Sequence, residues 1–223
     1  MAYILAIETT TKNCSVALFD DAKQLALKEL VSEGYSHAEQ LTIFIEEVLS
    51  EVKISINTLN AIAISMGPGS YTGLRIGTST AKGLCYTLDI PLIAISTLKA
   101  MALGISKNYD STLYCPMIDA RRMEVFAGMY DSENNEIREV NADVVDVNTY
   151  AEYLKNDVLF FGDGALKCAD IISNDNANFI KCYPTAKDIL TLAFQKYSNN
   201  DFVDVAYFEP FYLKDFVAGK KKN

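Results

Sequence analysis

The sequence is poor in the residues that build metal, disulfide and hydrolytic sites. It has one histidine, His37, and five widely spaced cysteines that never form a CxxC pair. Neither a disulfide framework nor a zinc site is indicated, and we expect the cysteines to be buried as small apolar side chains. Without a second histidine or a Gly-x-Ser-x-Gly elbow, a Ser-His-Asp relay is not indicated either.

Long apolar runs and an excess of positive charge are also missing. No run approaches the roughly 20 apolar residues of a membrane-spanning helix, and the N-terminal MAYILAIETT lacks the basic start and cleavage site of a signal peptide. The cytoplasm is therefore the expected location. The net charge of −9 argues against a broad nucleic-acid surface, because binding to phosphates relies on a basic patch. We expect any contact with RNA to be indirect.

The sequence does contain enough apolar residues for a globular core. Half of its 223 residues are hydrophobic, which suffices for one large core or two small ones. Alternating segments at 3–7, 14–19 and 24–30 predict an antiparallel meander of three strands.

A helix and two buried strands are expected to follow the meander. The capping-box pattern SHAE at 36–39 precedes apolar residues that recur at helical spacing over 37–52. The apolar runs at 61–65 and 91–96 are typical of buried parallel strands, with a helix to about Leu88 between them.

The second half of the chain repeats the opening pattern. LAIETTTKNCSVALFDD and CPMIDARRMEVFAGMYD each contain a strand ending in an acid, a tight turn and a second strand ending in Asp. Further strands are expected at 138–145 and in DVLFF, and helices at 148–155, 165–173 and 185–198.

A meander followed by helix, strand, helix and strand, occurring twice, predicts an α/β protein of two ribonuclease-H-like lobes. Such lobes, with mixed sheets flanked by helices, form the actin and Hsp70 (ASKHA) superfamily. We expect an N-terminal lobe at 1–106 and a C-terminal lobe at 107–223, with the C-terminal segment packing back on the first lobe.

Glu8 and Asp119 end the first strand of each half, where ribonuclease-H-like enzymes place metal-binding carboxylates. A two-metal site needs several carboxylates within a few ångströms, and neither half offers a second and third acid nearby. We therefore assign no catalytic residue and no metal ligand, and expect both acids to form turn and strand-end hydrogen bonds.

The loop GPGSYTG at 67–73 resembles a phosphate cradle at a helix N-terminus, but it lacks the Lys-Ser or Lys-Thr ending of the Walker motif. A strand-to-helix turn with glycine at positive φ, and with Ser70 or Thr72 as the helix cap, accounts for the same residues. We assign no cofactor to it.

In the helix after this loop, Gly73, Gly77 and Ala81 recur every fourth residue and form a smooth ridge. Glycine inside a helix destabilises by up to about 1 kcal/mol relative to alanine, so two on one face indicate close packing. The ridge contacts either the lobe's own sheet or a helix of a partner.

Several segments, in order along the chain, resemble the signatures of the TsaB (YeaZ) family. They are ILAIETT with CSVALFD, SHAEQL, GPGSYTGLRIG with KGL, ISTL, and DARRMEVFAGMY, and they span residues 4 to about 130. DARR followed by EVF is the most specific of them, because the catalytic relative TsaD carries a similar glycine loop. Glu8, Tyr71, Phe126 and Lys214 depart from the usual family residues, and the C-terminal third matches only loosely.

The resemblance implies a non-catalytic subunit that binds and activates TsaD, which transfers a threonylcarbamoyl group to the adenosine next to the tRNA anticodon. Where the metal-using relative has His-x-x-x-His, this chain has Thr97 and Met101, and neither side chain replaces imidazole at a catalytic metal. The TsaE-type ATPase is implied as a further partner.

The resemblance also implies that TsaD binds through the first helix and the glycine-loop helix. The interface residues expected there are His37, Leu41, Tyr71, Gly73, Leu74, Gly77 and Ala81. The same helices would permit an isologous homodimer, and tRNA would be contacted only indirectly.

Two other functions remain open at this point. One is a small ATP-binding phosphotransferase of the same superfamily, in which GPGSYTG and the GDG at 162–164 hold phosphates. The other is a ribonuclease-H-like nuclease acting through Glu8 or Asp119.

Overall fold

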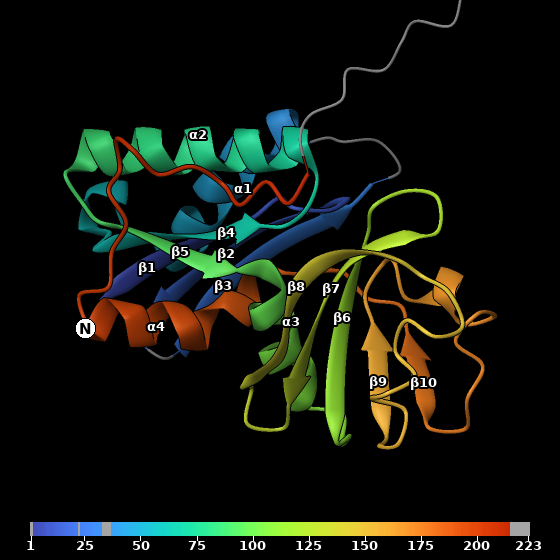
Figure 1. The fold of residues 1–223 in the computed structure, drawn as a ribbon. Coiled ribbons are helices and arrows are strands. Elements are labelled where there is room, and N and C mark those ends of the chain that lie inside the picture. The colour runs from blue at the N-terminus through green and yellow to red at the C-terminus, as the bar shows by residue number, and fades with distance from the viewer. Residues whose placement is uncertain (1, 22, 33–36, 215–223) are drawn as a thin grey trace, which may run out of the picture.

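Two five-stranded mixed sheets with the same strand order form the centre of the protein (Figure 1). The computed structural model describes residues 2–21, 23–32 and 37–214, and Ser36 of the expected capping box lies outside these ranges. The first sheet has the order β3-β2-β1-β4-β5 and the second the order β8-β7-β6-β9-β10. This repeated topology confirms the predicted fold of two ribonuclease-H-like lobes.

The first sheet combines the expected meander with two parallel strands. β1 pairs antiparallel with β2 and parallel with β4, so β1 lies at the centre of the sheet. Its strands are β1 (Tyr3–Glu8), β2 (Asn13–Asp20), β3 (Lys23–Val31), β4 (Ala61–Gly67) and β5 (Leu92–Ser96).

The second sheet repeats this pattern, with β6 antiparallel to β7 and parallel to β9. Its strands are β6 (Leu113–Asp119), β7 (Glu124–Asp131), β8 (Glu136–Val144), β9 (Val158–Phe161) and β10 (Ala177–Ile180). The helices are α1 (His37–Val52), α2 (Tyr71–Leu88), α3 (Thr97–Ser106) and α4 (Leu190–Ser198), with short 3₁₀ turns η1 (Ile56–Thr58), η2 (Leu166–Cys168) and η3 (Ala186–Ile189).

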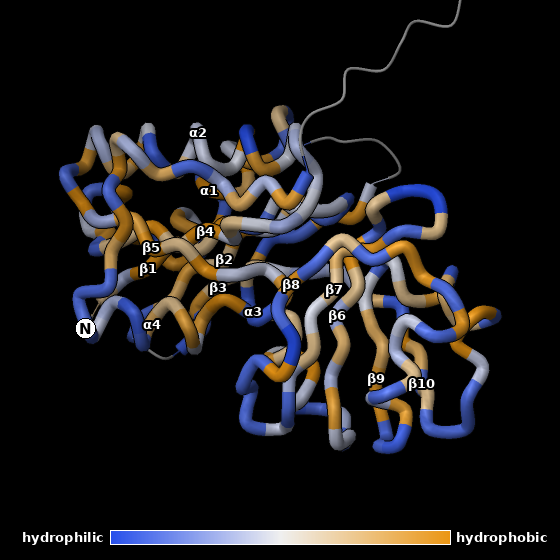
Figure 2. Tube along the Cα trace, in the orientation of Figure 1, coloured by the Kyte–Doolittle hydropathy of each residue, from blue (hydrophilic) through white to orange (hydrophobic). Residues whose placement is uncertain are grey.

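Helices cover both faces of the first sheet, because successive side chains of each strand point to opposite faces. Leu5 and Ile7 of β1 pack with α1 and α2 on one face, whereas Ile4 and Ala6 pack with α3, η3 and α4 on the other. Figure 2 shows the apolar character of the central strands β1, β4 and β5 between these layers. Among the described helices, none has the length and apolarity that crossing a bilayer requires.

Two predicted α-helices are wrong. Over 148–155 the chain forms successive turns, and over 165–173 it forms η2 and turns. Near 148 the Asp146 carboxylate accepts hydrogen bonds from Asn148 N and Thr149 Oγ1, both at 2.9 Å, and so competes with helix formation. Most backbone bonds that follow join residues three apart, as from Tyr153 N to Tyr150 O.

After β10 the chain returns to the first sheet. η3 and α4 pack against the face opposite α1 and α2. Val203 forms an antiparallel bridge with Leu92 of β5. The following residues run beside α2, as the red segment of Figure 1 shows. Four of the five cysteines are buried, as predicted, and Cys182 is partly exposed.

A half-buried carboxyl in η3, that of Asp188, predicts a pH-dependent stability. Burial raises the pKa of Asp188 from 3.8 to about 7, with Lys187 and Lys107 lowering it and Glu8 and Glu29 raising it further. Because the folded-state pKa lies above the unfolded one, ionisation of Asp188 destabilises the fold. This penalty is small below pH 4, grows as the pH rises and is complete above pH 7.

We therefore expect Asp188→Asn to raise stability at pH 8 by on the order of 2 kcal/mol, or about 4–8 °C in Tm, and to change it little at pH 4. Thermal unfolding at both pH values measures the difference. Asp175→Asn, at an exposed site, is the control. An Asp188→Asn variant whose Tm equals that of the parent at pH 8 would contradict the raised pKa.

Candidate interaction surface and interlobe cavity

The glycine loop is a tight turn from β4 into α2. Gly67 adopts φ +112°, a backbone conformation that residues other than glycine rarely adopt. Ser70 caps α2, its Oγ accepting a hydrogen bond from Gly73 N at 3.3 Å. The predicted turn and cap are both present.

The glycine ridge of α2 faces the lobe's own sheet. A Cβ at Gly73 would lie 2.0 Å from the backbone oxygen of Thr9, and one at Gly77 would lie 2.3 Å from Thr9 Oγ1. Thr9 Oγ1 donates a hydrogen bond to Gly73 O at 2.8 Å. Close packing against the residue that follows β1 is therefore the reason for these glycines.

Most of the residues expected at a partner interface lie inside the lobe. The side that they share faces the lobe's own sheet, and Tyr71 is half-buried, so contact of these residues with a partner stays a prediction. The buried ones are His37, Leu41, Gly73, Leu74, Gly77 and Ala81.

His37 illustrates this internal role. Its Nε2 lies 2.7 Å from the carbonyl oxygen of Thr11, and because a carbonyl only accepts, Nε2 carries the proton. Burial lowers the pKa of the imidazole. His37 thus ties the start of α1 to the loop between β1 and β2.

The faces of α1 and α2 that point away from the sheet are exposed and accessible to a partner. On α1 this face is acidic and also exposes Ile43, and on α2 it is composed mainly of small and polar residues. The exposed residues are Ala38, Glu39, Thr42, Ile43, Glu46, Glu47, Ser50 and Glu51 on α1, and Thr72, Arg75, Ser79, Gly83, Tyr86 and Thr87 on α2.

Two tyrosines project from this surface beside a shallow hollow. Tyr86 of α2 is 85% exposed and Tyr207 of the returning chain is 86% exposed. The hollow, of about 490 Å³, lies between α2 and residues 204–206. Gly83 forms part of its lining, and a Cβ at that position would meet no atom within 4 Å.

The two strand-end acids are held by groups of the chain itself. Glu8 is 1% exposed and accepts hydrogen bonds from Thr10 N at 2.6 Å and Thr10 Oγ1 at 2.5 Å. Burial raises the pKa of Glu8. Asp119 Oδ1 accepts from Arg121 N at 2.8 Å and lies 2.5 Å from the ammonium of Lys167.

Lys167 fills the position beside Asp119 that a cation could take. Its Nζ also donates to the carbonyl oxygens of Arg122 at 2.8 Å and Glu124 at 2.7 Å, so three oxygens surround one ammonium. Within the described part of the chain, no three His, Cys, Asp or Glu side chains are grouped so as to hold a metal.

A cavity of about 510 Å³ lies between the lobes. It brings together the glycine loop, the turn that carries DARR and the acid of GDG, which are far apart in the sequence. Its lining includes Thr10, Thr11, Gly69, Ser70, Tyr71, Thr72, Asp119, Arg121, Arg122, Glu124, Asp163, Tyr212, Leu213 and Lys214.

The glycines of GDG allow close packing against β6. A Cβ at Gly162 would lie 2.1 Å from Met117 O, and one at Gly164 would lie 3.0 Å from Asp119 N. Asp163 Oδ1 accepts from Asp119 N at 3.0 Å, which joins the GDG turn to the end of β6.

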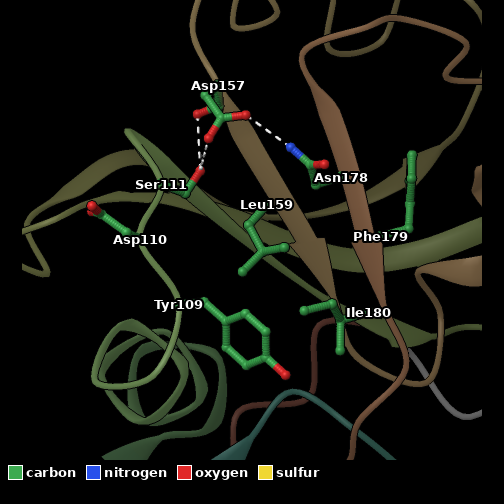
Figure 3. Close-up of a pocket in the computed structure, with 8 residues that line it drawn as sticks. All are labelled: Tyr109, Asp110, Ser111, Asp157, Leu159, Asn178, Phe179 and Ile180. Atoms are coloured by element: carbon green, nitrogen blue, oxygen red, sulfur yellow. Dashed lines mark hydrogen bonds between the residues drawn. The ribbon is translucent and has the colours of Figure 1, made fainter.

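A further hollow, of about 350 Å³, lies at the edge of the second sheet (Figure 3). At one end the Asp157 carboxylate accepts from Ser111 Oγ at 3.1 Å and Asn178 Nδ2 at 2.8 Å, and at the other end Tyr109 and Ile180 form an apolar wall. These hydrogen bonds join the residue before β9 to β10 and to the segment before β6.

Comparison with known proteins identifies the family. The family model of TsaD, tRNA N6-adenosine threonylcarbamoyltransferase, matches residues 34–222. The tRNA threonylcarbamoyladenosine biosynthesis protein TsaB of Escherichia coli (strain K12) is 33% identical, over 98% of this chain and 97% of the relative. TsaB of Haemophilus influenzae (strain ATCC 51907 / DSM 11121 / KW20 / Rd) is 30% identical, over 98% of this chain and 96% of the relative.

A solved structure agrees with the sequence comparison. YeaZ from Pseudomonas aeruginosa superposes with a TM-score of 0.82 at 28% identity and covers 96% of this chain and 100% of its own. The chain belongs to the TsaB (YeaZ) family of tRNA threonylcarbamoyladenosine biosynthesis proteins.

Proposed function

We propose that this chain is a non-catalytic subunit of the complex that transfers a threonylcarbamoyl group to the adenosine next to the tRNA anticodon. In this role it binds and activates the TsaD-type transferase. The proposal that the chain is non-catalytic rests on the surroundings of its two strand-end acids. Glu8 is buried and hydrogen-bonded to Thr10, and Asp119 forms an ion pair with Lys167.

The residues in place of His-x-x-x-His support the same conclusion. Thr97 Oγ1 accepts a hydrogen bond from Gly67 N at 3.2 Å, and Met101 is 3% exposed in the apolar cluster between α3 and the second sheet. Thr97 thus holds the glycine loop, and Met101 packs in the core. The phosphotransferase alternative also loses support. Close packing against β6 already accounts for the GDG glycines, which that alternative assigned to phosphate binding.

The transferase is proposed to bind the exposed faces of α1 and α2. This chain matches the family model of the transferase, so the two proteins are expected to share a fold. Two similar folds can pair through equivalent surfaces about an approximate two-fold axis, and two copies of this chain can do the same. A TsaE-type ATPase would join as a further partner, and tRNA would be contacted by the other subunits.

Sedimentation of this chain with the TsaD-type subunit of the same organism tests the proposal. We expect a one-to-one complex, and any homodimer of this chain should decrease as the transferase is added, because both use the same faces. A mixture that sediments as two separate proteins at concentrations of tens of micromolar would overturn the proposal.

A further inference from the structure

Residues 210–214, here called the C-terminal strap, run along the interlobe cavity and contribute Tyr212, Leu213 and Lys214 to its lining. The strap first fastens to the first lobe: Phe211 N donates a hydrogen bond to Met66 O at 2.7 Å. Gly67 leaves room for it, since a Cβ there would lie 2.7 Å from Phe211 O. The Tyr212 ring then packs on the Tyr71 ring at 4.9 Å between centroids.

The next two residues fasten the strap to the second lobe. Leu213 packs against the apolar cluster that contains Ile118 and Phe126. Lys214 forms an ion pair with the Glu124 carboxylate, on the strand that follows the DARR turn. Consecutive residues of one short segment therefore connect the two lobes.

The chain passes between the lobes at two earlier points, after α3 and after β10, at 107–112 and 181–185. Neither segment lines the interlobe cavity, whereas Tyr212, Leu213 and Lys214 do. Beside the first of these passages the lobes are also joined by the buried apolar cluster between α3 and the second sheet. The strap joins the lobes at the cavity by non-covalent contacts, which can be released.

These contacts suit a releasable connection. One is a single backbone hydrogen bond, one is a ring pair, one is the packing of the partly buried Leu213, and one is an ion pair whose side chains are 42% and 20% exposed. Such groups open more readily than buried strands, because few apolar contacts are lost. The sheets and their cores stay intact when the strap detaches.

We propose that the C-terminal strap is a latch that closes the 510 Å³ interlobe cavity by tying the glycine loop of the first lobe to the DARR strand of the second. Its release uncovers the cavity, while the buried cluster between α3 and the second sheet keeps the lobes together. The strap continues from a segment clamped to α2, where Lys82 Nζ donates to Ala206 O at 2.9 Å and Phe208 O at 3.1 Å. A partner bound to α2 would therefore act on the latch; this last step alone rests on the proposed function.

Hydrogen exchange of the isolated full-length chain tests the latch without any partner. We expect Lys214→Glu, which places two carboxylates together, to speed exchange about tenfold in cavity-lining peptides of both lobes, at 69–72 and 118–124. Exchange in the central strands β1 and β9 should not change. The charge swap Lys214→Glu with Glu124→Lys should restore the slow exchange.

Lys196→Glu is the matched control, because Lys196 pairs with Asp201 at 3.0 Å away from the cavity. It should leave the cavity peptides unchanged. Unchanged exchange at 69–72 and 118–124 in Lys214→Glu combined with Tyr212→Ala would overturn the latch. So would a rise throughout both lobes, because the strap would then be part of the folding core, or a swap variant that fails to restore protection.

Discussion

Replacing Tyr86 by arginine is expected to weaken binding of the TsaD-type transferase at least about 30-fold. The ring is 85% exposed and stands beside the hollow over Gly83, so it contributes little to the fold and is available to a partner. Tyrosines in such positions are frequent hot spots, where truncation costs about 2 kcal/mol or more. Arginine adds a charge that would lose its hydrating water when a partner covers the hollow, and this loss opposes binding.

Calorimetric titration with the transferase measures this effect, and thermal unfolding checks that the Tm stays within about 2 °C of the parent. Tyr109→Arg is the control, since Tyr109 is 45% exposed on the second lobe, at the other hollow. Equal affinity of the Tyr86 variant and the parent would place the transferase on a different surface.

Replacing Gly73 by alanine is expected to destabilise the fold by about 3 kcal/mol or more. The added Cβ would lie 2.0 Å from the backbone oxygen of Thr9 and 3.3 Å from the His37 ring, so backbone must move. Overpacking of this kind typically costs about 1–3 kcal/mol, and more where backbone is displaced. In a chain of this length the loss corresponds to a fall in Tm of roughly 10 °C.

Gly83→Ala on the same helix is the matched control. Its Cβ meets no neighbour within 4 Å, and alanine is the better helix former by up to about 1 kcal/mol. Thermal unfolding should therefore move in opposite directions for the two variants. A Gly73→Ala variant as stable as Gly83→Ala would mean that α2 does not pack on Thr9 as described.

The ridge also limits what the sequence could predict about the interface. Spacing at every fourth residue indicates that some backbone approaches α2 closely, but it does not say which one. The structure gives Thr9, at the end of β1, as that neighbour. A bulky residue at Gly77 would consequently damage the lobe before it reached any partner, and the exposed Tyr86 is the better position to test association.

Most of the fold could be predicted because its signals are local. Alternation and buried apolar runs located β1, β2, β4 and β5, and helical spacing located α1 and α2. α3 and β10 were not predicted, and β10 is a short, partly exposed edge strand. The turns at 148–155 depend on the hydrogen bonds of Asp146, which apolar spacing does not register.

The site depended on contacts between distant residues. The acids Glu8 and Asp119 could be singled out by their strand-end positions, but the pairing of Asp119 with Lys167 joins residues 48 apart in the sequence. The contacts of the strap could not be predicted from the sequence either. They pair Lys214 with Glu124 and Phe211 with Met66, which are far apart in the chain. No local pattern encodes these partners.

Reconstituted transfer of the threonylcarbamoyl group to tRNA tests the non-catalytic role most directly. The assay uses the TsaD-, TsaE- and TsaC-type proteins of the same organism, either without this chain, with the parent chain, or with the double variant Glu8→Gln and Asp119→Asn. We expect modification to depend on the chain, and the double variant to support it within about twofold of the parent, because neither acid reacts. Modification that proceeds equally without the chain, or that falls a hundredfold in the double variant, would contradict this role.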